Sequence, residues 1–159
     1  MMRDGGPSGL DSPSGPFGYD EVRPLLDALR DPVQAVRTGA LWALVRLPLR
    51  EGVWLDVGDF FWQELAPPVR DGDPETRVEP TVPRRELISA AIYVPIAPIR
   101  QRLHELVERG AEEERRITAH ALAWARDAAA IPQLVADLSD PDVDRRVQAA
   151  ESLSLLDVT

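Results

Sequence analysis

Apolar side chains recur at helical spacing near the beginning of the chain. A helix from about 19 to 30 places four of them on one face, namely Val22, Leu25, Leu26 and Leu29. Asp31 and Pro32 then open a second helix, because aspartate caps free backbone amides and proline suits the first helical position. The inward positions predicted for this second helix are Val36, Ala40, Leu41, Ala43, Leu44 and Leu47.

The same order of residues returns at the other end of the chain. A first helix carries Ile131, Leu134, Val135 and Leu138, and Asp140 with Pro141 opens a second. The inward positions predicted for that second helix are Val143, Val147, Ala150, Leu153 and Leu156. A shift of 109 positions without gaps superposes Leu25, Leu29, Asp31, Pro32, Arg37, Ala40 and Leu44 on Leu134, Leu138, Asp140, Pro141, Arg146, Ala149 and Leu153.

A weaker third copy lies 31 positions before the last one and 78 after the first. Its matching residues are Leu103, Val107, Arg115, Ala121 and Leu122, and Gly110 replaces the Asp-Pro start. A 31-residue period with two amphipathic helices per unit is typical of an α-solenoid, because one helix pair cannot bury both of its faces alone. We expect Arg37 and Arg146, each six residues after the aspartate, to bridge the turns of successive units by charge-assisted hydrogen bonds.

The segments LLDALRDPVQAVRTGALWAL and IPQLVADLSDPDVDRRVQAAESL resemble HEAT repeats, in particular the short bacterial kind named after phycobilisome lyases. The resemblance covers residues 20–47 and about 99–157. It implies an all-α, HEAT-like α-solenoid of about three helical hairpins, with an insertion between the first and second. Such repeats serve as adaptors, regulators and lyase subunits, so the resemblance predicts the fold more sharply than the function.

Residues 49–98 form the insertion in a domain expected over 19–159, and residues 1–18 read as a flexible leader rich in Gly, Pro and Ser. We predict two short helices joined by a loop at 66–83, with a β-hairpin through 53–62 as the alternative. The insertion holds an aromatic cluster of Trp54, Phe60, Phe61 and Trp62. Core packing is favoured for these rings, and a partner-binding patch is the functional alternative.

Composition excludes several kinds of chemistry. The chain has no Cys, no Lys and no Asn, which removes thiol nucleophiles, thiolate metal sites, Schiff bases and N-glycosylation. The net charge of −9 argues against nucleic-acid binding; colloidal solubility is the favoured interpretation of this charge, and a basic or amphipathic partner is the functional alternative. The sequence contains no apolar run long enough for a membrane-spanning helix and no signal-peptide pattern, so we expect a cytoplasmic location.

No catalytic, cofactor or metal site is predicted. The acidic loop residues Asp71, Asp73 and Glu75 lack the distal glutamate of a calcium loop. His104 and His120 could meet across a helix pair as metal ligands or as an acid–base couple, but ordinary packing or surface histidines are favoured. Ser89, Ser152 and Ser154 lie in no triad pattern. Three arginine pairs could line a basic stripe, but neighbouring carboxylates favour local neutralisation; these pairs are Arg84-Arg85, Arg115-Arg116 and Arg145-Arg146.

The function expected from these features is a non-catalytic protein–protein interaction scaffold or adaptor, acting through a concave helical face or the insertion. The alternatives are a phycobilin-lyase-like or lyase-chaperone subunit and a HEAT-like nucleic-acid-binding module. Because the last unit lacks a distinctive polar cap, we expect it to pack against further repeats, another protein or a second copy of the chain.

Overall fold

The computed structural model describes residues 17–65 and 81–156, and within these ranges the chain is all-helical, as predicted. The predicted leader up to residue 16 and the acidic loop with Asp71, Asp73 and Glu75 lie outside the described residues. Phe17 belongs to the folded part, because its N–H and C=O hydrogen-bond to Pro48 and Arg50. The helices are α1 (Tyr19–Ala28), α2 (Gln34–Val45), α3 (Glu51–Leu65), α4 (Arg84–Ala91), α5 (Ala97–Arg109), α6 (Glu112–Trp124), α7 (Ile131–Asp137) and α8 (Val143–Leu155).

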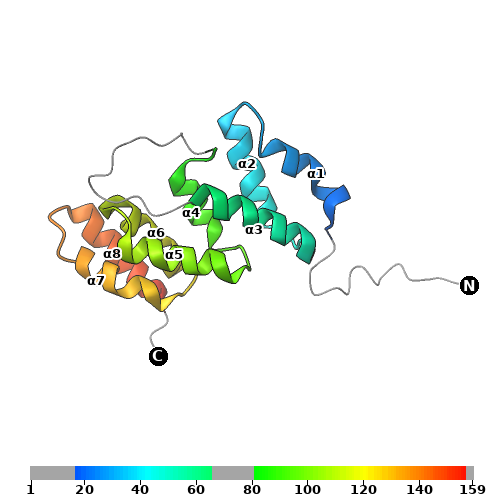
Figure 1. Cartoon of the computed structure of the whole chain (residues 1–159). Helices are drawn as coiled ribbons and strands as arrows, with labels where there is room; N and C mark the ends of the chain where they lie inside the picture. Colours follow the sequence, from blue (N-terminus) through cyan, green and yellow to red (C-terminus); the bar gives the residue numbers. More distant parts are fainter. Residues whose placement is uncertain (1–16, 66–80, 157–159) are drawn as a thin grey trace, which may run out of the picture.

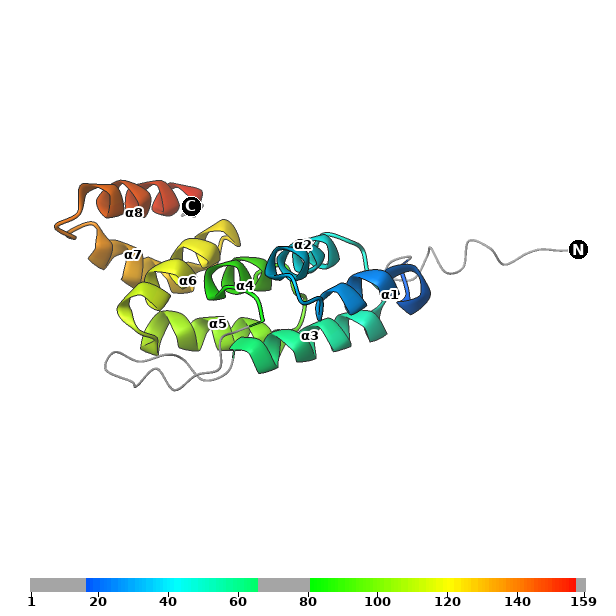
Figure 2. The same ribbon diagram turned by 90° about the horizontal axis from the view of Figure 1, so that it is seen from above.

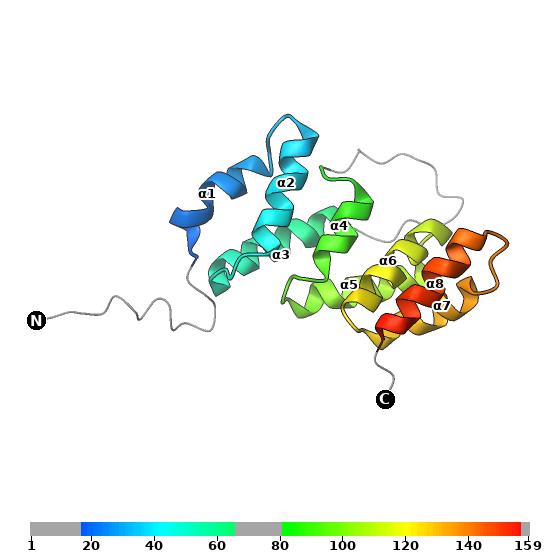
Figure 3. The same ribbon diagram turned by 180° about the vertical axis from the view of Figure 1, so that it is seen from behind.

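Consecutive helices pack as pairs: α1 on α2, α3 on α4, α5 on α6 and α7 on α8 (Figure 1). Between pairs, α2 contacts α4, α4 contacts α6 and α6 contacts α8, so these four helices follow one another in a row (Figure 3). We call this the even row. On the opposite side α3 contacts α5, and Figure 2 shows these two helices lying along one side of the molecule. A short 3₁₀ turn, Ala128–Ala130, leads into α7.

The insertion supplies the pair α3 and α4, so the prediction of two helices is confirmed and the β-hairpin alternative is wrong. Residues 53–62 lie wholly inside α3. The physical reason is a buried stripe at every fourth position, formed by Val53, Val57, Phe61 and Leu65. Gly58, which suggested a turn, instead allows Ile96 to approach closely, since a Cβ there would lie 3.1 Å from the Ile96 side chain.

The repeat register predicted from the sequence agrees with where three of the helices begin. Helices α2, α6 and α8 start at Gln34, Glu112 and Val143, which reproduces the spacings of 78 and 31 residues. The prediction that Asp31 and Asp140 cap α2 and α8 was wrong, because each helix begins two residues later than predicted. Asp31 and Asp140 each accept a hydrogen bond at 2.8 Å from the backbone N–H two positions later, so each Asp-Pro pair closes the turn before its helix.

The repeated arginines close the turn of their own hairpin. Arg37 Nη1 donates to the carbonyl oxygens of Asp31 at 2.7 Å and Pro32 at 3.0 Å. Arg146 makes the same two bonds to Asp140 and Pro141, at 2.7 and 3.1 Å. The acceptors are backbone carbonyls, which remain available because the turn leaves them without helical partners.

Of the two arginines expected to bridge successive units, Arg37 does so, while the bonds of Arg146 go to its own turn; Arg115, at the equivalent repeat position, also reaches the next hairpin. Arg37 Nε donates to the carbonyl oxygen of Thr81 at 2.6 Å, immediately before α4. Arg115, which bonds to the carbonyl oxygen of Gly110 at 2.5 Å, donates through Nε to Gln133 Oε1 of α7 at 3.3 Å. The guanidinium groups of Arg37 and Arg115 therefore each link one turn to the following helix pair.

The last hairpin buries fewer of its apolar residues than predicted. α8 turns Ala149 and Ser152 inward. The residues predicted inward that are exposed instead are Val36 in α2 and Val135, Leu138, Val143, Val147 and Ala150 in the last hairpin. In the repeat pattern, one face of each hairpin packs against the hairpin that follows it. On α7 and α8 no described residue covers this face.

Candidate functional site: a groove along the even row

An apolar hollow of about 270 Å³ lies where α2, α4 and α6 end. Three aromatic rings from three hairpins line it: Trp42 in the last turn of α2, Tyr93 just after α4, and Trp124 at the end of α6. Trp124 is 61% exposed and Tyr93 49% exposed. Rings of this size are normally covered by other side chains, so their exposure around one hollow is unusual.

The ring of Trp42 is held in a fixed orientation. Its Nε1 donates a hydrogen bond to Glu86 Oε2 at 2.7 Å, and its ring meets Tyr93 edge-on at a centroid distance of 6.2 Å. The Arg46 guanidinium lies 5.2 Å from the same indole centroid. These contacts come from α2, α4 and the segment that follows each, so the hollow is formed before any ligand enters.

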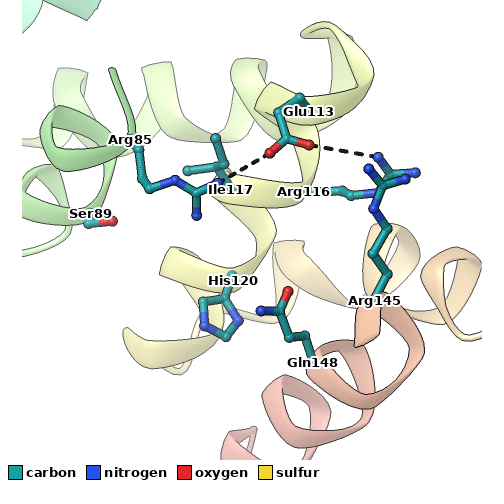
Figure 4. A pocket seen from close by; sticks show the side chains of 8 residues that line it. All are labelled: Arg85, Ser89, Glu113, Arg116, Ile117, His120, Arg145 and Gln148. Atoms are coloured by element: carbon teal, nitrogen blue, oxygen red, sulfur yellow. Dashed lines mark hydrogen bonds and ion pairs between the residues drawn. The ribbon is translucent and has the colours of Figure 1, made fainter. Parts of the chain in front are cut away.

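A polar cleft of about 180 Å³ continues the hollow along α4, α6 and α8 (Figure 4). Ser89 and His120 line both the cleft and the hollow, so the two form one groove along the even row. The other residues that line the cleft are Arg85, Glu113, Arg116, Ile117, Arg145 and Gln148.

Carboxylates neutralise the arginines of this cleft, which confirms the predicted local neutralisation. Glu113 lies between Arg85 and Arg116, at 3.2 and 3.9 Å (Figure 4). Arg116 also pairs with Glu112, with Asp140 at 2.8 Å and with Asp137 at 3.6 Å. Burial lowers the pKa of Arg116, but the bond to Glu112 and the surrounding carboxylates outweigh it and raise that pKa above the ordinary value.

The two members of each arginine pair have different tasks, which the sequence alone did not reveal. The first-turn position of α4 places Arg84 against the end of α3, where Nη2 donates to the carbonyl oxygen of Leu65 at 3.0 Å. Arg115 and Arg146 bind turn carbonyls in the same manner. The adjacent residue of each pair lines the cleft; these are Arg85, Arg116 and Arg145. Successive residues of a helix differ by about 100° in direction, so neighbours cannot face the same partner.

His120 forms a hydrogen bond through Nδ1 with Ser152 Oγ across α6 and α8. Burial lowers the pKa of His120, and Arg85 lowers it further, while Glu151 opposes them. Ser152 is completely buried, so no substrate carbonyl can reach its hydroxyl. The pair therefore joins two helices and does not form a nucleophilic centre.

His104 has a different partner, so the two histidines share no site. Its Nε2 lies 2.7 Å from Asp127 Oδ2, and Arg100 reaches the same oxygen at 3.1 Å. Burial raises the pKa of Asp127, but hydrogen bonds from His104, from the Ala129 N–H and from Arg100 lower it below the ordinary value. This cluster holds the connection between α6 and α7.

The aromatic cluster predicted from the insertion lies mostly in the core. Phe61 is fully buried, and Trp54 and Phe60 are partly buried against the core. Trp62 is exposed, and the Arg102 guanidinium lies 4.2 Å from its ring centroid. Partner binding by this cluster stays a prediction, with Trp62 as its exposed member.

Residues 17–65 and 81–156 contain neither a candidate metal site nor a candidate membrane-spanning helix. No group of three or more His, Cys, Asp or Glu residues there could hold a metal ion. None of the helices in those ranges is both long and apolar enough to cross a membrane.

Comparison with known proteins finds no match to a protein-family model, a curated protein or a solved structure. The HEAT-repeat resemblance therefore remains a prediction, and a functional proposal has to rest on the geometry of the groove.

Proposed function

We propose that the chain is a non-catalytic protein-interaction module, built as a HEAT-like α-solenoid whose even row binds a partner protein. The order of helix contacts supports the solenoid arrangement, because each even helix packs on the next and each helix also packs on its hairpin partner. The recurrence of the turn-closing arginine in three hairpins supports it further.

The observation that carries the proposal is the composition and exposure of the groove. Trp, Tyr and Arg are the residue types that contribute most binding energy at protein interfaces. Here Trp42, Tyr93 and Trp124 surround the hollow, and Arg85 and Arg145 line the adjoining cleft. The hollow is shaped before binding, so little ordering of side chains is needed when a partner binds.

The partner that fits this groove is an amphipathic segment of a protein with basic residues at its polar edge. An apolar side chain would enter the hollow between the aromatic rings. Glu113, which lines the cleft, is 59% exposed, and Glu112 and Asp142, which pair with the cleft residues Arg116 and Arg145, are about half exposed, so these carboxylates are accessible to a basic residue. A nucleic acid fits less well, because the arginines of the cleft are already paired with carboxylates and the chain carries a net charge of −9.

The proposal is tested by comparing three alanine variants with the original chain. Proteins captured from the native source are identified, and the strongest binder is purified for calorimetry. We expect Trp124→Ala to weaken binding at least about tenfold, since anchor residues typically contribute about 2 kcal/mol or more. Leu55→Ala, an equally exposed apolar site on α3, is the matched control and should leave the Kd within about twofold.

The third variant, Trp62→Ala, separates the groove from the insertion. Loss of affinity in Trp62→Ala with no change in Trp124→Ala would place the binding face on α3 and refute the assignment to the even row. Equal affinity in all three variants would exclude both surfaces.

A further inference from the structure

The last hairpin carries an exposed apolar edge on α7 and α8. Val143 is 57% exposed, Val147 50% and Leu138 40%. Helix α8 lies at the outer end of the even row, with its other side packed on α6 and α7 (Figure 2). Large aliphatic side chains that gather on one side of a terminal helix are typical of an interaction surface.

The repeat allows each exposed residue to be compared with its equivalents in the same molecule. Leu29 and Val107 hold the repeat position of Leu138, 109 and 31 residues earlier. Both are only 5% exposed, against 40% for Leu138. Leu29 and Val107 each belong to a hairpin that is followed by another described hairpin, and Leu138 does not. The difference in exposure therefore comes from whether a second hairpin packs over the residue.

The exposed edge of α8 also differs in residue type from the equivalent edge of α6. Glu112 and Arg116 stand 31 positions before Val143 and Val147. In α6, Arg116 reaches the next hairpin by pairing with Asp137 and Asp140. In α8 valines replace these charged residues, so the edge cannot recognise a following hairpin through the same ion pairs.

Four residues form a continuous line along the exposed side of α8: Val143, Val147, Ala150 and Ser154. Their spacing of four, three and four residues is that of a contact seam between two helices. The small side chains of Ala150 and Ser154 allow a second helix to approach closely. We call this line the α8 seam.

We propose that the α8 seam pairs in parallel with the same seam of a second copy of the chain, forming a two-fold dimer. The seam contains no ionisable side chain, so it can face its own copy without placing like charges together. The flanking charges favour the parallel direction. Antiparallel pairing sets Asp144 of one copy against Glu151 of the other, whereas parallel pairing keeps these two carboxylates apart.

The first test is the mass of the full chain in solution, measured by light scattering from low micromolar to near-millimolar concentration. We expect the mass to rise from 17.6 kDa toward twice that value and then to stop. Val147→Glu should remain monomeric over the same range, because two buried carboxylates would meet in the dimer. Val36→Glu, an exposed valine early in α2, is the matched control and should dimerise as the original chain does. Circular dichroism confirms that both variants keep their helix content.

The second test uses the absence of cysteine from the chain. Parallel pairing brings the two copies of residue 150 together, so Ala150→Cys should form a disulfide-linked dimer on mild oxidation. Leu55→Cys, on an exposed site of α3, should not. A chain that stays monomeric throughout, a Val147→Glu variant that still dimerises, a mass that grows without limit, or crosslinking no better in Ala150→Cys than in Leu55→Cys would each overturn the proposal.

Discussion

Two neighbouring ion pairs between α4 and α6 allow one prediction to be worked out in detail. Arg84 pairs with Glu114 at 2.5 Å, and the next residues, Arg85 and Glu113, pair at 3.2 Å. The residue types and helices are the same, and the burial differs. The Arg84 and Glu114 side chains are 18% and 6% exposed, whereas those of Arg85 and Glu113 are 67% and 59% exposed.

We expect Arg84→Met to lower the free energy of unfolding by about 3 kcal/mol, because it removes the ion pair of a buried carboxylate. The substitution also removes the hydrogen bond that Arg84 donates to the Leu65 carbonyl. Arg85→Met should cost less than about 1 kcal/mol, since water screens an exposed pair. At about 2–4 °C per kcal/mol for a chain of this size, Arg84→Met lowers the melting temperature by about 6–12 °C.

Urea denaturation of the two single variants gives both free energies. The double variant Arg84→Met/Glu114→Leu provides the internal control, because replacing both charges leaves no buried carboxylate without its arginine. It should be more stable than Arg84→Met alone by at least about 1 kcal/mol. Burial does not decide the strength of these pairs if the free energies of unfolding of Arg84→Met and Arg85→Met differ by less than about 0.5 kcal/mol. The same conclusion follows if the double variant loses as much free energy of unfolding as its two single substitutions added together.

Three further predictions concern single positions. Phe61→Ala should cost about 3–5 kcal/mol in urea denaturation, because it leaves a cavity in the core, whereas Trp62→Ala should cost about 1 kcal/mol; similar costs for both would contradict the burial that separates them. Gly39→Ala should raise the free energy of unfolding by up to about 1 kcal/mol, since nothing lies within 4 Å of the new Cβ, while Gly110→Ala should lower it, because its Cβ would lie 2.6 Å from the Leu106 carbonyl oxygen; the reverse order would show that the turn relaxes freely. Because burial lowers the pKa of His120, the unfolded chain binds that proton more readily, so stability falls as the pH drops through the unfolded value of about 6.5. His120→Gln should flatten this part of the pH dependence, and an unchanged profile would assign it to other groups.

Local patterns in the chain were sufficient to place most helices. The 31-residue period predicted the starts of α2, α6 and α8 relative to one another, because amphipathic spacing and turn residues act over a few neighbouring positions. The same reasoning singled out the repeated arginine, but it predicted a bridge between successive units, whereas in three hairpins this arginine binds the carbonyls of its own turn. It misjudged the Asp-Pro pairs by two residues, since an aspartate before a proline can cap a turn as well as a helix.

The groove could not be predicted in that way. Trp42, Tyr93 and Trp124 belong to three hairpins, and no local pattern distinguishes them from core residues. The densest aromatic cluster in the sequence was predicted to pack in the core, and its member Phe61 is fully buried, whereas the exposed rings of the groove come from other parts of the chain. A ring is exposed or buried according to which helix packs over it, and that is a property of the stacking.

The exposed edge of α8 shows the same division between local and distant causes. Periodicity marks Val143 and Val147 as one side of a helix, which is information carried by neighbouring residues. Whether that side is core or surface depends on a second hairpin arriving against it, as happens for Val107 and not for Leu138. Helical spacing along a chain thus specifies the faces of each hairpin, and contacts between residues far apart in the chain settle which faces remain open to a partner.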